Sequence, residues 1–283
     1  MQHISNSKRF IKQILYYINR YYSEKNIKDH TPIAGLSFDA IHLHVNVYGT
    51  YEKLELEVIS EFLDKNMKEF DIALDVGANI GNHTVRLLAS KFDKVYCYEP
   101  NEVVFDLLSV NTKPLGNVVC HNFGLSDKNT EVNFKENKTN IGASFITSSK
   151  SSDSSDDVYK RVQVRILDDE NIIGTVGLIK VDIEGHEIFF LKGATETIKR
   201  DKPTILFEEA LINENGSSEV IDYLKGLEYE FFTISENFFF GDSKFQRLAR
   251  YLLQDLFGIK VKIVKTEKFG RRFHHLIIAK PKD

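Results

Sequence analysis

The chain has 283 residues, of which 42% are hydrophobic and 28% are charged, which is an ordinary composition for a globular protein. Its formal net charge is −4, so no global basic field exists to attract nucleic-acid phosphates, and a nucleic-acid substrate is not favoured. The two cysteines suggest neither a disulfide framework nor a zinc site, and neither a signal peptide nor an apolar run of the ~18 residues that span a bilayer is evident, so a cytoplasmic location is expected.

The first 50 residues are predicted to form an N-terminal extension made of a helix and a strand. Apolar residues between Ile4 and Tyr22 recur close to helical spacing, and basic residues occupy much of the remaining surface. Such a helix fits docking on the body, a contact in a homodimer, or binding to an anionic lipid surface. The alternation of apolar and polar residues from Ile41 to Val47 predicts a half-exposed strand, which would place His42 and His44 on one solvated face.

Residues 51–283 are predicted to form one α/β domain. A helix is expected from residue 52 to about residue 68. The strands that follow, with helices between most of them, are predicted at 72–76, 94–98, 117–121, 177–182, 204–209, 229–234 and 274–279. This alternation predicts a Rossmann-like, seven-stranded, mostly parallel sheet with helices on both faces. Right-handed crossovers bring the carboxyl ends of its strands to one edge, where ligands bind.

Two segments interrupt this alternation. The polar, serine-rich stretch at 148–160 is predicted to be a flexible loop between short strands at 131–134 and 161–166, and either a lid over substrate or a tolerated surface insertion explains it. An insertion at 238–268 is predicted to contain a helix near 245–256 and a strand near 259–264.

The turn after the first core strand indicates the cofactor. The sequence Ile72 to Gly81 is a short apolar strand followed by a G-x-x-x-G turn and then a helix from His83 to Lys91. Dinucleotide sites prefer G-x-G-x-x-G, and a P-loop needs Lys-Ser/Thr after its glycines, so neither pattern fits. A cofactor without phosphates fits better, and S-adenosylmethionine (SAM) is the obvious candidate.

A carboxylate at the end of the second strand supports the same interpretation. Glu99 lies roughly 20 residues beyond the glycine turn, which is the position that binds a ribose diol in such folds. Pro100 then ends the strand before a helix at 102–110. The alternative is an ordinary solvated acid at the end of a strand.

Acidic residues also follow the fourth and fifth core strands. Asp182 comes at the end of the fourth strand, with Glu184, His186 and Glu187 just beyond it. Helix capping explains Glu184 and Glu187 well, but a carboxylate at the end of a buried strand needs a specific partner. The fifth strand ends in Glu208 and Glu209, so these acids and Asp182 could converge and hold magnesium or manganese.

With these motifs the chain resembles the FkbM family of SAM-dependent methyltransferases, which have the class I methyltransferase fold. The similarity covers about residues 51–236. The segments that show it are Tyr51-Glu52, Leu74–Gly81 with Thr84, Glu99-Pro100, Gly124–Asp127, Asn140–Ser144, Ile179–Glu187, Leu191–Ala194 and Pro203–Glu208. The Lys-x-Asp-x-Glu-Gly-x-Glu segment is fairly specific. His83 and His186 depart from the residues that the family often has there.

The resemblance implies SAM-dependent O-methyl transfer to a hydroxyl of a sugar, a glycan or another small molecule. It implies that the cofactor is bound by Asp75, Gly77, Ala78, Asn79, Gly81, Thr84, Glu99 (at the ribose) and Asn122 (near the adenine). Asp182 is the first candidate for a general base and His186 the second, and Glu208 and Glu209 would orient the acceptor or bind a metal. If a metal binds, its ligands would be Asp182, Glu208 and Glu209. A protein or RNA methyltransferase, or a non-catalytic SAM-binding module, is the alternative.

Overall fold

The computed structural model describes residues 6–67, 71–136, 145–147, 158–209, 212–236, 260–270 and 274–282, with single positions at 249, 256 and 258. Its helices are α1 (Asn6–Asp29), α2 (Ala40–Tyr48), α3 (Lys53–Asn66), the π-helical turn η1 (Thr84–Leu88), α4 (Ala89–Lys91), α5 (Glu102–Thr112), α6 (Glu187–Gly193), α7 (Thr195–Asp201) and α8 (Glu219–Gly226), with short 3₁₀ turns at Lys113–Leu115 and Leu167–Asp169.

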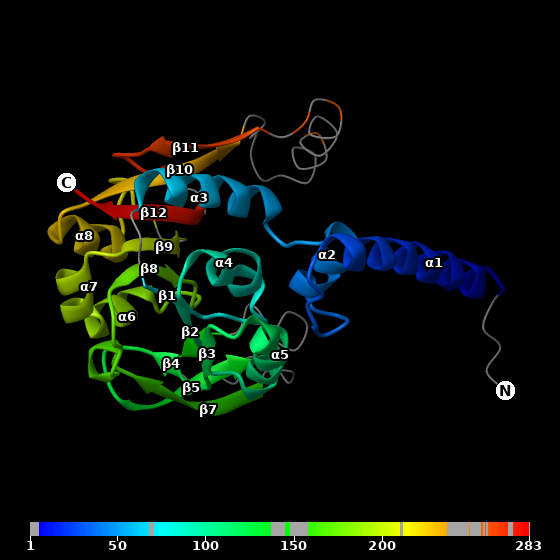
Figure 1. The fold of residues 1–283 in the computed structure, drawn as a ribbon, viewed down its shortest axis with the longest axis horizontal. Coiled ribbons are helices and arrows are strands. Elements are labelled where there is room, and N and C mark those ends of the chain that lie inside the picture. The colour runs from blue at the N-terminus through cyan, green and yellow to red at the C-terminus, as the bar shows by residue number, and fades with distance from the viewer. Residues whose placement is uncertain are drawn as a thin grey trace.

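A mixed eight-stranded sheet forms the centre of the molecule (Figure 1). Its order is β11-β10-β12-β9-β8-β1-β2-β3, and β3, β2, β1, β8 and β9 run parallel, whereas β12 is antiparallel to both of its neighbours. The strands are β1 (Ile72–Val76), β2 (Lys94–Tyr98), β3 (Val118–His121), β8 (Val176–Val181), β9 (Thr204–Glu209), β10 (Tyr229–Glu236), β11 (Val261–Lys265) and β12 (His274–Pro281). The α/β prediction and its seven strands are confirmed.

The eighth strand and a second sheet were not part of the predicted core. β11 pairs antiparallel with β10 and extends the edge of the sheet, so part of the predicted insertion belongs to the sheet. The second sheet has the order β4-β7-β5-β6, with β4 (Gly124–Leu125), β5 (Thr130–Glu136), β6 (Phe145–Thr147) and β7 (Val158–Arg165). Residues 158–160 of the predicted loop therefore lie in β7. Residues 148–157 and nearly all of the helix predicted near 245–256 lie outside the described residues.

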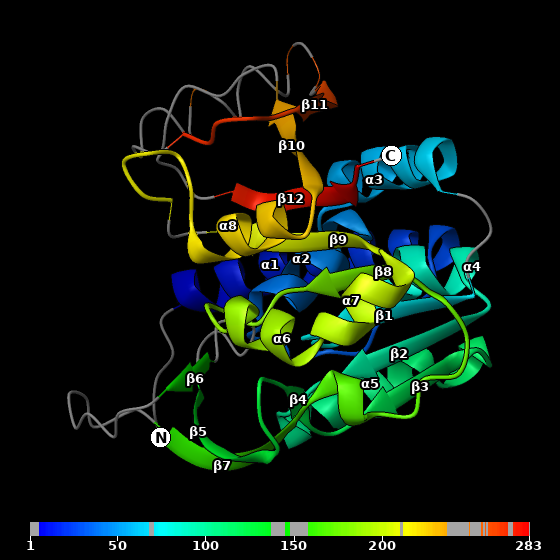
Figure 2. The same cartoon turned by 90° about the vertical axis from the view of Figure 1, so that its left-hand side faces the viewer.

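Helices cover both faces of the large sheet (Figure 2). Successive side chains of a strand point to opposite faces. In β1, Leu74 packs with Phe190 of α6 and Ile221 of α8 in one apolar core, whereas Ala73 packs with α3 and η1 in the other. The two cores bury the central strands β1, β8 and β9 almost completely, so polar side chains of these strands reach a cavity only at the carboxyl ends.

The prediction of a strand at 41–47 is wrong, because these residues lie in helix α2. The sequence pattern also places Ile41 and Val45 four residues apart, which is helical spacing. The Asp39 side chain accepts hydrogen bonds from the backbone N–H groups of Ile41 and His42, and Gly49 ends the helix with φ +84°. These two caps favour a helix. His42 and His44 accordingly do not share the face of a strand.

Truncation of the central strand β8 tests this layered arrangement. Leu178 is fully buried in the core beneath α3 and η1. We expect Leu178→Ala to lower the free energy of unfolding by about 2–5 kcal/mol, because it removes apolar contacts and leaves a cavity. Urea denaturation followed by circular dichroism measures this, with the exposed Val110→Ala as the control. Equal stability of the two variants would contradict the assignment of Leu178 to the core.

Candidate active site

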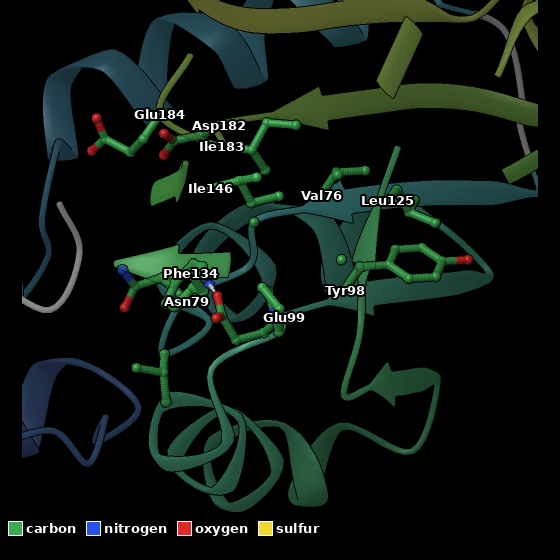
Figure 3. Close-up of a pocket in the computed structure, with 14 residues that line it drawn as sticks. Val76, Asn79, Tyr98, Glu99, Leu125, Phe134, Ile146, Asp182, Ile183 and Glu184 are labelled. Atoms are coloured by element: carbon green, nitrogen blue, oxygen red, sulfur yellow. Dashed lines mark hydrogen bonds between the residues drawn. The ribbon is translucent and has the colours of Figure 1, made fainter. Parts of the chain in front are cut away.

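A cavity opens at the carboxyl ends of β1, β2 and β8, with an empty volume of about 640 Å³ including its open mouth. One set of lining residues comes from the large sheet, the turns that follow its strands and the start of α5: Val76, Gly77, Asn79, Tyr98, Glu99, Pro100, Val104, Asp182, Ile183 and Glu184. The second sheet and its approach contribute Gly124, Leu125, Phe134 and Ile146. Figure 3 shows Asp182 and Glu184 on one side of the cavity and Asn79 and Glu99 on the other.

The glycine turn brings bare backbone close to the end of β8. Gly77 has φ +75°, and a Cβ atom at this position would lie 1.9 Å from the carbonyl oxygen of Asp182. Only glycine satisfies both requirements without moving the backbone. The turn is also tied to β2, because the N–H groups of Gly77 and Ala78 donate to the carbonyl oxygen of Tyr98. The floor of the cavity is therefore held at two points.

Glu99 directly follows β2, and both oxygens of its buried carboxyl group accept hydrogen bonds from backbone N–H groups. The N–H of Asn79 donates to Oε2 over 3.1 Å, and the N–H of Asn101 donates to Oε1 over 2.8 Å. Each oxygen keeps a further lone pair for a ligand. Burial raises the pKa of Glu99 to about 7, although these two hydrogen bonds and the charge of Lys180 oppose the shift.

A buried lysine that the sequence analysis did not single out links the two halves of the site. Lys180 Nζ donates to the carbonyl oxygen of Gly77 over 2.9 Å and lies 3.3 Å from Asp75 Oδ1 and 3.4 Å from Asp182 Oδ2. Burial by itself lowers the pKa of Lys180, but Asp182, Asp75 and Glu208 outweigh it and hold the pKa above its ordinary value. The lysine therefore stays charged in the interior. The sequence feature that indicates this ion pair is the Lys-x-Asp spacing, because residues two apart in a strand point to the same face.

Asp75 lies behind the wall of the cavity and is fully buried. Its Oδ2 accepts a 2.6 Å hydrogen bond from Thr84 Oγ1, and its Oδ1 faces Lys180. Asp75 and Thr84 do not line the cavity, and neither do Ala78 and Gly81, although all four were predicted to bind the cofactor. Their placement gives them a supporting position behind Gly77 and Asn79, which do line it.

Two other predicted site residues have partners outside the cavity. Asn122 donates through Nδ2 to the carbonyl oxygen of Glu99 over 3.0 Å and so braces the end of β2. His186 Nε2 lies 2.9 Å from Ser126 Oγ, and its ring stacks on Phe189 with the ring centres 4.6 Å apart. Neither residue lines the cavity. The structure therefore favours Asp182 over His186 as the residue that faces a ligand.

Acidic side chains gather beside Asp182. Burial, followed by the negative charges of Asp182 and Glu52, raises the pKa of Glu208 to about 9, although the positive charge of Lys180 opposes the shift. At neutral pH Glu208 thus holds a proton and can donate a hydrogen bond. Tyr51 lies near the same acids. Burial is the largest cause that raises the pKa of Tyr51, and the negative charges of Glu52, Glu208 and Asp182 add to it. Glu52 also lies 2.8 Å from Nε2 of His83, one of the two histidines that depart from the family pattern.

The two acids at the end of β9 point in different directions. Glu208 interacts with the negative charge of Asp182, whereas Glu209 accepts a hydrogen bond from Ser218 Oγ at the start of α8. Adjacent residues of a strand point to opposite faces, so the two side chains do not meet at one site. The described residues hold no group of three or more His, Cys, Asp or Glu side chains placed to bind a metal ion. The predicted metal set of Asp182, Glu208 and Glu209 is therefore not brought together.

The Methyltransferase FkbM domain family matches residues 75–231 of the chain, which is more than half of its length and includes the whole glycine turn and both acidic strand ends. The chain belongs to this family. Family membership agrees with the resemblance seen in the sequence and with the class I methyltransferase fold predicted from it.

Proteins similar to the chain include methyltransferases. The chain is 30% identical over 146 residues to the hexuronic acid methyltransferase AglP of Haloferax volcanii, and the match covers 51% of this chain and 58% of that protein. The chain thus spans little more than half the length of this relative. A solved Methyltransferase FkbM from Methylobacillus flagellatus is 16% identical with a TM-score of 0.42, covering 93% of this chain and 58% of that one. A SAM-dependent O-methyltransferase from Thermotoga maritima is 14% identical with a TM-score of 0.42, covering 83% and 66%.

Removal of the lysine tests its ion pairs. We expect Lys180→Met to lower the free energy of unfolding by about 3–5 kcal/mol, because it leaves Asp75 buried without its counter-charge. The double variant Asp75→Asn/Lys180→Met should lose less than the single lysine variant, because it removes both charges. Urea denaturation of the two variants and of the exposed Lys199→Met control gives these differences. A double variant less stable than Lys180→Met would show that the unpaired charge of Asp75 does not cause the loss of stability.

Glu99 should make stability depend on pH. The folded protein holds the Glu99 proton up to a pKa of about 7, whereas an unfolded glutamate releases it near 4.5. The folded state binds more protons between these values, so this residue's contribution to stability falls as the pH rises through that window. We expect Glu99→Gln to gain up to about 3 kcal/mol relative to the parent between pH 4.5 and pH 7.5.

Urea denaturation across this pH range measures the effect of Glu99. The exposed Glu57→Gln on α3 is the matched control and should run parallel to the parent. Curves for Glu99→Gln and the parent that stay parallel at every pH would show that Glu99 titrates normally.

Proposed function

We propose that the protein is a SAM-dependent O-methyltransferase that acts on a hydroxyl of a sugar, a glycan or another small molecule. The observation that supports this most is the cavity in which Gly77 offers bare backbone beside the buried Glu99 carboxylate, in a chain of the FkbM methyltransferase family. Such a carboxylate suits a ribose diol, since two hydroxyl donors meet two acceptor oxygens.

The residues around the cavity fit SAM in their chemistry. Glu99 would accept from the ribose hydroxyls, and the apolar side chains of Leu125, Phe134 and Ile146 would contact the adenine. Gly77 and Asn79 would lie along the methionine portion. SAM would supply an electrophilic methyl group on a sulfonium, whose positive charge the carboxylates on the opposite wall favour. None of these contacts requires a phosphate-binding loop.

The chain's own task is to place and deprotonate the acceptor hydroxyl. Asp182 is partly exposed to the cavity, and Lys180 fixes its carboxylate from behind. Asp182 would accept the hydroxyl proton as the alcohol oxygen attacks, which is general-base catalysis. Glu208, which holds a proton at neutral pH, would donate a hydrogen bond to the acceptor. Positioning of the oxygen in line with the methyl group would supply a large part of the rate.

The charge of the site bears on the acceptor. The relative AglP is a hexuronic acid methyltransferase, which supports a sugar acceptor for this chain as well. The acids beside Asp182 would repel an acidic sugar, so a neutral hydroxyl-bearing sugar suits this site, or else a divalent cation would bridge the acids and the sugar. Magnesium or manganese should therefore be included in the activity assay.

The free thiols of Cys97 and Cys120 support the prediction of a cytoplasmic location.

Substitution of Asp182 separates binding from chemistry. We expect Asp182→Asn to lower kcat for methyl transfer to a sugar acceptor by 100-fold or more, as removal of a general base does, while the Kd for S-adenosylhomocysteine stays within about threefold. Calorimetry measures the Kd. A screen of nucleotide-linked sugars and oligosaccharides for transfer of labelled methyl groups, with added divalent metal or EDTA, measures the turnover.

Glu196→Gln, an exposed acid on α7, is the matched control and should behave as the parent. Full kcat in Asp182→Asn would contradict the role of the base. Label on protein or RNA instead of sugars would favour the macromolecular alternative, and tight SAM binding without any transfer would favour a non-catalytic module. A protein that binds neither SAM nor S-adenosylhomocysteine would overturn the proposal.

A further inference from the structure

Helix α1 carries a large apolar surface that the rest of the described chain leaves uncovered. Its 24 residues correspond to a length of about 36 Å, and Figure 1 shows the helix projecting away from the body. The large apolar side chains that are each at least 39% exposed are Phe10, Ile11, Ile14, Leu15, Tyr16, Tyr17, Ile18, Tyr21 and Tyr22. A cluster of this size on a projecting element marks an interaction surface.

The helix is attached to the body near its carboxyl end. Asn26 donates through Nδ2 to the carbonyl oxygen of Asn46 over 2.7 Å and to that of Val45 over 3.5 Å, and both of these acceptors lie in α2. The residues that form the apolar cluster precede this anchor. The surface is therefore presented on an arm whose base is fixed.

The charge of this arm is opposite to that of the chain as a whole. The helix contains six basic and two acidic residues, whereas the whole protein has a formal net charge of −4. No acidic residue precedes Glu24 in the sequence, and Glu24 is paired with Arg20 at 2.7 Å. The first turn of the helix has no acid, so basic residues stand at the end where the helix dipole is already positive. An anionic surface outside the chain would compensate this charge.

From this combination we infer that α1 lies on anionic lipid surfaces, with its apolar cluster in the headgroup region and its basic side chains on lipid phosphates. An amphipathic helix with basic residues and aromatic side chains binds membranes in this way without crossing them. Tyrosine suits the interface because its ring is apolar and its hydroxyl is polar. None of the helices in the described part of the chain combines the length and apolarity that a transmembrane helix needs.

A second copy of α1 fits this surface less well. Tyr16 and Tyr17 are adjacent, as are Tyr21 and Tyr22, and neighbouring residues cannot both face a narrow seam between two helices. The ring centres of each pair are 5.4 Å apart in an edge-to-face contact, so each pair occupies a wide arc of the helix surface. Two copies would also bring together helices with the same excess of positive charge. A lipid surface accepts a broad apolar face and attracts that charge.

Vesicle co-sedimentation of the full chain tests the inference. We expect binding to vesicles of phosphatidylcholine and phosphatidylglycerol to be at least tenfold stronger than to phosphatidylcholine alone, and to weaken at high salt. Arg9→Gln/Lys12→Gln should weaken binding about tenfold or more, because two basic residues are lost near the surface. Ile14→Asp/Ile18→Asp should abolish it.

Matched controls remove the same chemistry elsewhere. Lys53→Gln/Lys65→Gln changes two exposed lysines of α3, and Val110→Asp/Ile173→Asp changes two exposed apolar residues outside α1. Both should bind anionic vesicles as the parent does, and circular dichroism should show all four variants folded.

Four results would overturn the inference. The first is a parent protein that binds neither kind of vesicle. The second is anionic-vesicle binding that all four variants retain equally. The third is sedimentation that shows a dimer which only Ile14→Asp/Ile18→Asp dissociates, with no lipid binding. Binding to a single-stranded RNA that the same α1 variants abolish, without vesicle binding, would likewise assign the helix to a different partner. SAM binding does not enter these measurements, so failure here leaves the proposed function unaffected.

Discussion

The buried charge of Lys180 is the constraint on which the site depends. An uncompensated ammonium in a protein interior is costly, so Asp75, Asp182 and the carbonyl oxygen of Gly77 must stay close to it. Asp75 is behind the turn, Gly77 is its floor, and Asp182 is on the cavity wall. One side chain thus contacts the buried Asp75, the glycine turn and Asp182 on the cavity wall, and a displacement of either carboxylate would leave a charge without its partner.

The surrounding acids are differentiated by their environment more than by their residue type. Glu99 is engaged by two backbone N–H groups and faces one side of the cavity, whereas Glu208 is buried among like charges and holds a proton at neutral pH. Asp182 has a lysine at its back. Three acids at the carboxyl ends of β2, β8 and β9 therefore have three different environments: Glu99 accepts two backbone hydrogen bonds, Asp182 is paired with a lysine, and Glu208 is buried among like charges. This division comes from burial and from the placement of one cation.

The two ends of the molecule differ in charge and in packing. The methyltransferase domain buries its sheet between two apolar cores and gathers acids at the edge where its strands end. The N-terminal helix does the reverse, with apolar side chains exposed and basic residues between them. An acidic body and a basic, apolar arm are what a protein needs if only the arm is to approach an anionic surface.

The amino-acid sequence by itself determined the parallel core, because buried strands are continuous apolar runs whose ends are marked by glycine, proline or acids. The glycine turn, Glu99 and Asp182 were identified for the same reason, since local chemistry at a strand end does not depend on distant partners. The periodicity of residues 41–47 was ambiguous between strand and helix, and the caps at Asp39 and Gly49 decided it.

Only the tertiary structure decided which polar residues meet. It directs Glu208 toward Asp182 and Glu209 toward Ser218, places His186 against Ser126, and sets Asp75 behind the cavity wall. It also brings Phe134 and Ile146 of the second sheet over the cavity. These contacts join segments far apart in the chain, and a one-dimensional pattern contains no information on the distance between them. The pleat of β9 fixes the opposite directions of Glu208 and Glu209. The buried charge of Lys180 fixes which carboxylates lie beside it.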